Sequence, residues 1–531
     1  MEKHCIIKIL PQNINITAAQ GDNIYRVLAE SGLLLDGDCG GRATCRRCRI
    51  QIKSRNILPP KEQEKSIFSP EQLQNGWRLA CLHQVSEDLI LEMPSYDAAS
   101  SQTEFVCYPD KLSADSELAV AVDIGTTSIA GGLIDLHTGA ILALSSLPNS
   151  QRSFGADIIT RIAYCSENAY GLDRLHQAVW CNIADLIKKL IAEVKADASK
   201  IKIITLVANS AMSHIAWGLS PESLAQAPYE PLFYHGQEKR ADQLPLARYY
   251  PAITAQVCLL PNIGGFLGSD TVAAALSCGM QDKKDWDCWT LLLDIGTNGE
   301  VVLAGKGRIL AASAAAGPAF EGAHIVCGMR ATAGALQSVS WEKGDIKWHT
   351  IADAPLIGIC GSGLLSLIAF LRRQNIINKN GRLQFQESAE HLLSGRLQGE
   401  GPNRRFVLQD GIALYQEDIR QFQLAKGAIA ACCQILLKEV DANIKDVQQV
   451  LLAGAFGNKL ARTDAIDVGL LLPIDESKVH YVGNAAWQGA YLAAIDPMQR
   501  QAAQALAKEV CHIATSRQAG FQDVFVKSLL F

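Results

Sequence analysis

Four cysteines in the N-terminal part of the chain have the spacing of an iron–sulfur site. Cys39, Cys45 and Cys48 lie in one glycine-containing stretch, with five and then two residues between them, and Cys81 follows far downstream. Four thiolates are the ligand set of a [2Fe–2S] cluster, with two sulfurs for each iron. The two glycines after Cys39 allow a tight loop whose backbone N–H groups approach the sulfurs and tune the reduction potential. The sequence therefore predicts an electron-transfer site.

A structural zinc ion is the alternative occupant, because zinc also accepts four thiolates. Zinc sites of this kind usually pair one C-x2-C with a second. In this chain three cysteines share one loop and the fourth stands alone. The spacing therefore favours the cluster over zinc.

Two similar apolar strands, each ending in an aspartate, are the second feature with a chemical meaning. Residues 118–127 read LAVAVDIGTT and residues 290–299 read TLLLDIGTNG, and each leads into a second strand, a glycine turn and a third strand. A carboxylate at such a strand end can hold Mg²⁺ through water, while the amides and hydroxyls of the next loop hold phosphate. Two copies with the same surroundings indicate a duplicated domain that binds one nucleotide between its halves.

The candidate nucleotide-binding residues are two aspartates and the loop residues that follow them. We assign the catalytic contacts to Mg²⁺ and ATP to Asp123 and Asp294, and phosphate contacts to Gly125, Thr126, Thr127, Gly296, Thr297 and Asn298. For either copy alone, the alternative is a strand-end carboxylate that only caps a turn. The chain has no G-x-x-x-x-G-K-[ST] sequence, which argues against a P-loop protein.

This duplicated arrangement resembles the superfamily of actin, Hsp70 and the sugar kinases, in which two related α/β lobes of the ribonuclease H-like type supply the phosphate loops. The resemblance implies an actin-like ATPase body, with residues 118–289 as the first lobe and 290–531 as the second. It also implies a glycine-rich adenosine loop after a strand, where glycines let the backbone approach the nucleoside. Residues 450–457 (VLLAGAFG) fit this loop, and its candidate contacts are Gly454, Ala455 and Gly457.

Two further segments have small residues and no single assignment. Residues 358–363 (GICGSG) and 482–486 (VGNAA) could serve the nucleotide cleft or the hinge between the lobes, and simple packing is the alternative for both.

The residues around the cysteines predict a small domain of strands and one short helix. Apolar residues at helical spacing place the helix at 23–30, and alternating or short apolar runs place strands at His4–Leu10, 13–17, 49–53 and 89–93. This stretch resembles the β-grasp ferredoxins, which have an α+β fold, and the five-residue gap is similar to the adrenodoxin-like and some bacterial branches. The resemblance implies a [2Fe–2S] ferredoxin domain over residues 1–94.

A polar stretch without periodicity separates this domain from the ATPase body. Residues 95–117 are expected to form a linker, so that the cluster domain can swing. Cys107 lies in the linker and is expected to be a bystander.

Composition excludes several classes of protein. The 531 residues are 48% hydrophobic and 19% charged, which is typical of a soluble protein with more than one domain. A net charge of −5 offers no basic field for nucleic acid. The N-terminus lacks the order of a secretory signal, and residues 354–371 are apolar but broken by glycines, so we expect a cytoplasmic protein without a membrane span. Its 16 cysteines are then buried side chains or metal ligands rather than disulfides.

A ferredoxin fused to an actin-like ATPase resembles the reductive activators of corrinoid proteins. Further stretches similar to that family are residues 209–214 (NSAMSH), 227–231 (APYEP), 315–325 (AAGPAFEGAHI) and 327–330 (CGMR). Two features differ from some relatives. The linker is too short for the extra domain that some carry, and near the C-terminus only Cys511 is available, where others have 4Fe–4S ligands. Subunit pairing is therefore open, with a homodimer as one form.

The resemblance implies a one-electron transfer from the [2Fe–2S] cluster to Co(II) of a corrinoid protein in a methyltransferase system, restoring Co(I). The implied cofactors are the cluster, ATP and Mg²⁺, and the implied partners are the corrinoid protein and an upstream electron donor. Three alternatives are a redox-gated small-molecule kinase, a chaperone-like nucleotide-dependent binding module with a structural cluster, and an activator of radical dehydratases. Cys327, Cys360, Cys432 and Cys433 have apolar or glycine-rich neighbours and are expected to pack rather than bind iron.

Overall fold

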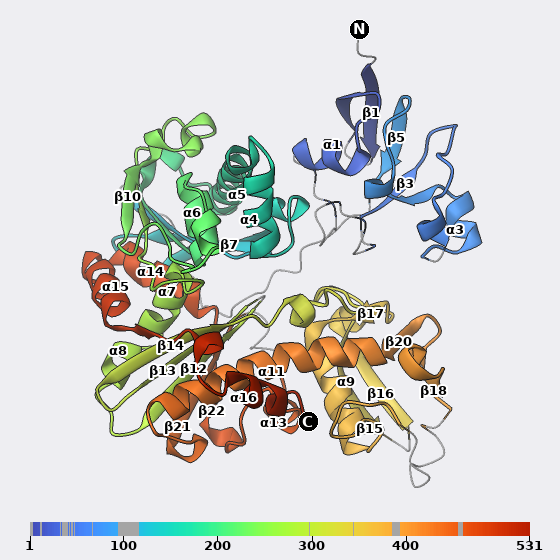
Figure 1. Ribbon diagram of the computed structural model, residues 1–531. Coiled ribbons are helices and arrows are strands. Elements are labelled where there is room, and N and C mark those ends of the chain that lie inside the picture. Colours follow the sequence, from blue (N-terminus) through green and yellow to red (C-terminus); the bar gives the residue numbers. More distant parts are fainter. Residues whose placement is uncertain are drawn as a thin grey trace.

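The computed structural model describes residues 4–531 apart from 11–12, 32, 34, 36–40, 42, 44–45, 47, 66, 94–115, 297, 343–344, 385–392, 394 and 455–459. Three parts of the chain have hydrophobic cores of their own: an N-terminal domain and two α/β lobes (Figure 1).

The N-terminal domain is a five-stranded sheet with a short helix beside it. The strand order is β2-β1-β5-β3-β4, with β1 and β5 parallel at its centre. The elements are β1 (His4–Leu10), β2 (Ile14–Ala19), α1 (Ile24–Glu30), β3 (Arg49–Ile52), α2 (Glu62–Lys65), α3 (Pro70–Gln74), β4 (Trp77–Leu79), the 3-10 turn η1 (Ala80–Leu82) and β5 (Leu89–Glu92). Alternate residues of β1 are buried, as its apolar and polar alternation predicts. This is the expected α+β ferredoxin-like order.

Lobe 1 is built on a six-stranded sheet of order β10-β11-β9-β6-β7-β8. Its strands are β6 (Leu118–Ile124), β7 (Ser128–Asp135), β8 (Ile141–Pro148), β9 (Ile201–Ala208), β10 (Gln237–Arg240) and β11 (Gln256–Leu259). Its helices are α4 (Ile158–Glu167), α5 (Gly171–Val194), α6 (Ser210–Trp217), α7 (Ser269–Ser277) and α8 (Met280–Lys283). The central strand β6 is almost entirely buried, which explains its unbroken apolar run.

Lobe 2 repeats this plan with a sheet of order β22-β21-β12-β13-β14-β23. Its strands are β12 (Trp289–Ile295), β13 (Gly299–Gly305), β14 (Arg308–Ala314), β21 (Val447–Ala453), β22 (Val479–Gly483) and β23 (Cys511–His512). Its helices are α11 (Gln416–Glu439), α13 (Arg462–Asp467), α14 (Ala485–Ile495), α15 (Pro497–Glu509) and α16 (Phe521–Ser528). In both sheets two antiparallel hairpins follow the aspartate strand, and a later strand pairs with it in parallel. The expected duplication is therefore present.

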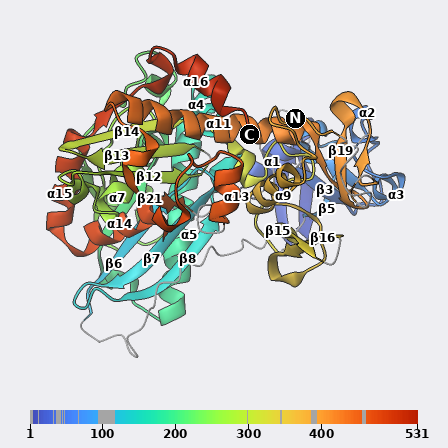
Figure 2. The ribbon, with the colours of Figure 1, turned by 90° about the horizontal axis from the view of Figure 1, so that it is seen from below.

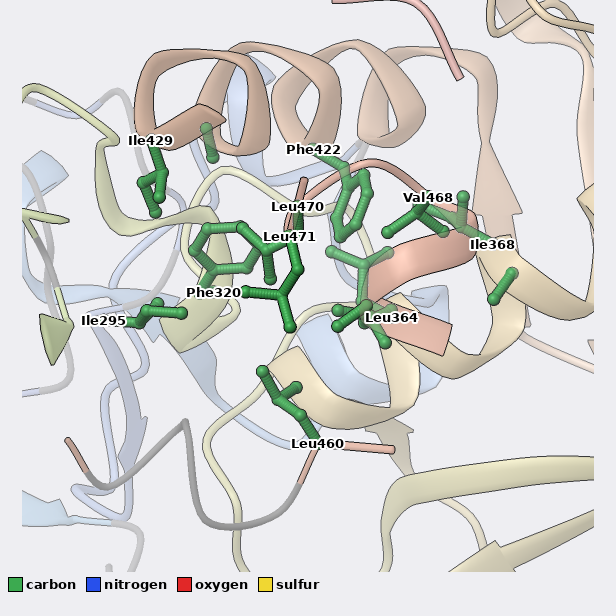
Figure 3. Close-up of a cluster of buried hydrophobic side chains, with 14 of the residues drawn as sticks. Ile295, Phe320, Leu364, Ile368, Phe422, Ile429, Leu460, Val468, Leu470 and Leu471 are labelled. Carbon is green, nitrogen blue, oxygen red and sulfur yellow. The ribbon is translucent and has the colours of Figure 1, made fainter. Parts of the chain in front are cut away.

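A subdomain that the sequence did not predict is inserted in lobe 2. It contains β15 (Ala335–Glu342), β16 (Asp345–Thr350), β17 (Gly358–Ile359), α9 (Gly361–Arg373), β18 (Leu397–Gln398), β19 (Arg405–Gln409) and β20 (Ile412–Tyr415). Figures 1 and 2 place it on the same side of the lobes as the N-terminal domain. Its core joins that of lobe 2, where Phe320, Leu364 and Phe422 meet (Figure 3).

The apolar stretch at 354–371 becomes a turn followed by the buried helix α9, as its glycines predict. Gly363 has no room for a side chain, because a Cβ there would lie 2.1 Å from the carbonyl oxygen of Leu336. Packing therefore accounts for this glycine segment. Within the described ranges, none of the helices has the length and apolarity needed to span a bilayer.

Two helices cross where the lobes meet. Helix α7 leads from lobe 1 into β12, and α14 of lobe 2 packs on β6 and β9 of lobe 1. A Cβ at Gly489 would lie 2.1 Å from the carbonyl oxygen of Ala273, so the two backbones touch. The indole Nε1 of Trp487 donates to the carbonyl of Ala121 at 3.1 Å. A movement of one lobe relative to the other therefore shifts α7 against α14.

Candidate functional site

The first predicted phosphate loop begins with Asp123, the sixth residue of β6. Burial raises the pKa of Asp123 to about 6, although the amide Nδ2 of Asn484 donates to its Oδ2 at 2.9 Å. Asn484 precedes α14, so the segment at 482–486, for which packing and a site role were both open, does contact the aspartate. A carboxylate from lobe 1 is thus held by an amide from lobe 2.

Side chains from three elements support the backbone of this loop. Asn149 donates to the carbonyl of Gly125 at 2.8 Å, and Arg161 of α4 donates to the carbonyl of Thr126 at 2.5 Å. Asn209, the N-cap of α6, donates to the hydroxyl of Thr126 at 3.1 Å. Burial lowers the pKa of Arg161 to about 9, so its guanidinium stays charged at neutral pH. A buried positive charge behind a phosphate loop favours an anionic ligand.

The second predicted loop follows Asp294, at the same place in β12. Asp294 lies opposite Glu300 in the neighbouring strand β13 and beside Ala453 in β21. Burial, and then repulsion by Asp123, raises the pKa of Asp294 to about 7. Burial and the nearby acids also raise the pKa of Glu300 well above its usual value. The two aspartates from different lobes are therefore close enough to interact.

Asp270, at the start of α7, is a third aspartate in this group. Burial, and then the charge of Asp123, raises its pKa to about 7, and its carboxylate accepts from the backbone N–H of Thr271. Neither Asp270 nor Glu300 was predicted from the sequence. The sequence offered one signal for each residue. Asp270 is a charged residue in the small-residue stretch GSDT, and Glu300 is an acid near the start of an apolar strand.

Four acids that repel one another at a domain boundary indicate a site for a cation. Mg²⁺ is usually held by one or two carboxylates together with water and substrate phosphates, rather than by an all-protein cage. Consistent with this, no three His, Cys, Asp or Glu side chains come close enough to share a metal ion in the part of the chain that the structure describes. The residues present therefore fit a Mg²⁺–nucleotide complex in which the nucleotide supplies ligands.

One hydrogen bond joins the first phosphate loop to lobe 2. The hydroxyl of Thr127 donates to Oε2 of Glu321 at 2.5 Å. Glu321 ends the 3-10 turn η7 (Pro318–Glu321), inside the stretch 315–325. Thr127 is thus held by a carboxylate in this arrangement, a contact that the sequence did not reveal.

Gly454, the predicted start of the adenosine loop, touches the second aspartate. Its φ is +87°, and a Cβ there would lie 2.7 Å from Oδ1 of Asp294 and 2.8 Å from the carbonyl oxygen of Ile295. Glycine is needed both for the left-handed backbone and for this approach. The structure therefore brings Asp123, Asp294 and Gly454 together, whereas Thr297, Ala455 and Gly457 lie outside the described residues.

We expect Gly454→Ala to weaken nucleotide binding by about tenfold, because the added methyl group must displace the carboxylate of Asp294. Calorimetric titration with the Mg²⁺–nucleotide measures this change. Gly307→Ala is the matched control: Gly307 also has a positive φ, +78°, but nothing lies within 4 Å of its Cβ position. If both variants bound nucleotide like the parent, Gly454 would not belong to the nucleotide site.

Two of the four predicted cluster ligands lie side by side at the end of the N-terminal sheet. The backbone N–H of Ala80 donates to the carbonyl of Cys48 at 2.8 Å, and Cys81 is the next residue. Both cysteines are buried, and Asn23, the N-cap of α1, donates to the carbonyl of Cys81 at 2.9 Å. Cys39 and Cys45 lie outside the described residues. The described pair fits half of the ligand set of a [2Fe–2S] cluster.

The four cysteines expected to pack lie far from this pair in the fold, in lobe 2 and its subdomain. Cys360, Cys432 and Cys433 are each 1% exposed. Burial raises the pKa of Cys432 to about 11 and also raises the pKa of Cys327 and Cys433. Cys432 and Cys433 belong to the hydrophobic core of lobe 2, and Cys327 packs against it, which fits the expectation that they pack.

Family models match the chain in three consecutive parts. Residues 7–86 match the 2Fe-2S iron-sulfur cluster binding domain, residues 118–283 match the RACo middle region, and residues 289–531 match the C-terminal domain of RACo, described as its ASKHA domain. The three matches follow one another in the order of the N-terminal sheet and the two lobes.

Individual proteins resemble the chain over most of its length. A corrinoid activation enzyme, RamQ of Eubacterium limosum, is 32% identical over 78% of this chain and 70% of its own. A [Co(II) methylated amine-specific corrinoid protein] reductase of Methanosarcina barkeri is 25% identical over 69% of this chain and 68% of its own. A solved structure titled reductive activator for corrinoid, iron-sulfur protein superposes with a TM-score of 0.70, at 26% identity, over 99% of this chain and 98% of its own.

Proposed function

The chain belongs to the RACo family of reductive activators of corrinoid proteins, and we propose that it uses a bound nucleotide to drive one electron from a [2Fe–2S] cluster to the cobalt of a corrinoid protein. The relatives named as a corrinoid activation enzyme and a Co(II) corrinoid protein reductase support this reaction. The electron would convert Co(II) to Co(I), the nucleophilic form that methyl transfer requires. An upstream donor would then reduce the cluster again.

The observation that carries the proposal is the presence of both sites in one chain. Cys48 and Cys81 are adjacent in the N-terminal domain, and Asp123 and Asp294 meet where the two lobes join. A bound [2Fe–2S] cluster takes up and releases single electrons. Cys39 and Cys45 complete the proposed ligand set. Cys48 precedes β3, and Cys81 follows β4. Because these two strands pair with each other, the fold fixes the spacing of the two thiols.

Nucleotide is needed if cobalt has a lower reduction potential than the cluster. For a one-electron transfer, each ~59 mV of unfavourable difference lowers the equilibrium constant tenfold. A gap of one or two such steps costs about 1.4–2.8 kcal/mol, which a nucleotide-driven change in binding to the corrinoid protein can supply. The nucleotide therefore acts on protein conformation and need not contact the electron path.

The described residues indicate which side chains would bind the nucleotide and which would take part in its hydrolysis. Asp123 and Asp294 would anchor Mg²⁺, while the hydroxyls of Thr126 and Thr127 would face the phosphates. Asp270, whose carboxylate is close enough to Asp123 to be affected by its charge, would accept the proton of an attacking water. Closure of the lobes on the nucleotide would turn α7 against α14 and so change the surface offered to the corrinoid protein.

Two other functions are less well supported. A redox-gated kinase would phosphorylate a small molecule, whereas the named relatives act on corrinoid proteins. A chaperone-like module with a structural cluster would not need a redox partner, whereas the named relatives act on corrinoid proteins.

We expect the purified protein, supplied with a chemical reductant, to convert a Co(II) corrinoid protein to Co(I) at least about tenfold faster with Mg²⁺–ATP than without it. Stopped-flow absorbance distinguishes the two cobalt states. Free cob(II)alamin serves as the control substrate, because it lacks the protein surface on which lobe closure would act. Equal rates with and without nucleotide would contradict the nucleotide-driven mechanism, and no reduction at all would contradict the reductase function.

A further inference from the structure

The N-terminal domain contacts lobe 1 through a charged pair. Nη1 of Arg174, in the first turn of α5, donates to Oε1 of Glu30 at 2.6 Å, and Glu30 is the last residue of α1. The same nitrogen donates to the hydroxyl of Tyr164 in α4 at 3.2 Å. Figure 1 shows α1 beside α4 and α5. We call this contact the seam.

A pocket of about 340 Å³ lies along the seam, with lining residues from both domains. The N-terminal domain contributes Tyr25 and Gly41, and lobe 1 contributes Phe154 and Tyr164. Gly41 is two residues after Cys39, and its φ of +85° and its contact with the Tyr25 ring leave no room for a side chain. The seam therefore reaches the loop that carries the predicted cluster ligands.

Helix α4 also holds the first phosphate loop, which follows Asp123 and is called phosphate loop 1 here. Arg161 is fully buried, and its guanidinium bonds to the carbonyls of Thr126 and Gly155 and to the side chain of Gln151. Arg161 and Tyr164 are three residues apart in this helix, so they lie on neighbouring turns of one face. Tyr164, near its last turn, packs its ring on Phe154 at a centroid distance of 5.1 Å. One short, capped helix thus holds the phosphate loop through Arg161 and lines the seam pocket through Tyr164, one turn further along.

The contacts of Thr127 indicate the direction in which the nucleotide would act. In the arrangement with a closed seam, the Thr127 hydroxyl is bonded to Glu321, which also attracts Arg161. A phosphate that took this hydroxyl would have to displace the carboxylate of Glu321, because the two anions repel each other. Binding therefore favours a different position of the loop, and the loop is tied to α4 through Arg161.

We propose that α4 couples nucleotide binding at phosphate loop 1 to docking of the N-terminal ferredoxin domain on lobe 1, with the nucleotide favouring release. This inference rests on the nucleotide site of the proposed function. Coupling between two binding events is reciprocal, so the docked domain must weaken nucleotide binding by the same factor by which the nucleotide weakens docking. Release would free the cluster loop from the seam, so that it could approach a corrinoid protein.

The test uses the full chain and measures both sides of this coupling. Hydroxyl-radical footprinting reports the exposure of Phe154 and Tyr164 at the seam, with the already exposed Tyr170 as internal reference. Calorimetry reports the affinity for Mg²⁺–ATP. The variants are Arg174→Glu, which places like charges across the seam, and the double exchange Glu30→Arg with Arg174→Glu, which restores an opposite pair. Arg240→Glu removes a comparable exposed pair with Asp242, in lobe 1 but away from the seam.

We expect Arg174→Glu to increase labelling of Phe154 and Tyr164 roughly fivefold and to tighten nucleotide binding by up to the same factor, since an exposed pair contributes little more than this. The double exchange should restore both values, Arg240→Glu should change neither, and Mg²⁺–ATP should raise seam labelling in the parent protein. Increased labelling of Arg174→Glu without tighter binding would overturn the coupling. Unchanged labelling would overturn the seam itself. A parent protein that binds no nucleotide would instead refute the nucleotide site of the proposed function.

Discussion

Replacing Asp294 with Asn is expected to lower nucleotide-stimulated reduction of a corrinoid protein by at least about 100-fold while leaving the cluster spectrum intact. The change keeps the shape of the side chain but removes one of the two anionic anchors that the proposed Mg²⁺ site takes from different lobes. No predicted cluster ligand lies in lobe 2, so the N-terminal domain should fold and load as before. Visible absorbance, calorimetry with Mg²⁺–ATP and Co(I) formation measure the three properties.

The same variant should be at least as stable as the parent at neutral pH. The pKa of Asp294 is raised to about 7 by burial and by Asp123. An acid with a raised native pKa binds more protons in the native state than in the unfolded state between pH ~4 and 7. Its contribution therefore lowers the free energy of unfolding as the pH rises through this range, and Asn removes that cost. Thermal unfolding at pH 5 and pH 8 checks the sign.

Asp135→Asn is the matched control, because Asp135 is a buried acid of opposite character. It ends β7 and accepts hydrogen bonds from Ser116 and from the backbone of His137 and Thr138, which lower its pKa. Asp135→Asn should reduce stability and spare nucleotide binding. Full nucleotide stimulation in Asp294→Asn would mean that the two D-I-G-T loops are not the nucleotide clamp.

The parts of the molecule that the sequence predicted depend on local patterns. Cysteine spacing identified Cys48 and Cys81, which the fold brings together. The repeated strand and turn around Asp123 and Asp294 identified two lobes whose sheets share the order of five strands and differ in the edge to which the sixth is added. In each case the residues that matter are neighbours along the chain or recur at the same place in a repeat. Such patterns are visible without knowledge of the tertiary structure.

The parts that the sequence did not predict depend on long-range packing. Asp270 joins the acidic group because α7 starts beside β6 and β12, and Glu300 joins it through the register of β12 and β13. Glu321 reaches Thr127 across 194 positions of the chain. Arg161 lies in an amphipathic helix, and no local pattern in the sequence marks its guanidinium as buried. The subdomain around α9 was not predicted, because β17 and β18 have only two residues each and β17 pairs with β15 across a gap in the sequence.

Three residues connect elements that move relative to each other in the proposed mechanism. Asn484 and Glu321 reach from lobe 2 to the first phosphate loop, and Arg161 connects that loop to α4. Single hydrogen bonds between lobes contribute about 1 kcal/mol each, so they can form and break as the nucleotide binds. In the proposed mechanism the two aspartates hold the nucleotide, whereas these three contacts transmit its binding to other parts of the protein.

Cys81→Ser should produce the opposite phenotype to Asp294→Asn: loss of iron and of electron transfer with normal nucleotide affinity. The parent protein should hold the two iron atoms and two sulfides of a [2Fe–2S] cluster. Serine oxygen is a poor replacement for thiolate sulfur, so iron content should fall to less than about half and Co(I) formation to the background rate. Iron analysis and visible absorbance measure the cluster. Stoichiometric zinc in the parent, without visible absorbance, would contradict the cluster reading.

Cys5→Ser separates loss of a ligand from damage to the domain. Cys5 is 2% exposed and lies in β1 of the same sheet, so its replacement disturbs the same core. It is not in the predicted ligand set, and iron content should therefore stay at the parent value even if the domain is less stable. Equal loss of iron in Cys5→Ser and Cys81→Ser would show that general unfolding, rather than ligation by Cys81, explains the result. If Cys5→Ser kept its iron while Cys81→Ser lost it, the cluster would lie at the pair formed by Cys48 and Cys81. The fold holds this pair together through the hydrogen bond from the backbone of Ala80 to that of Cys48.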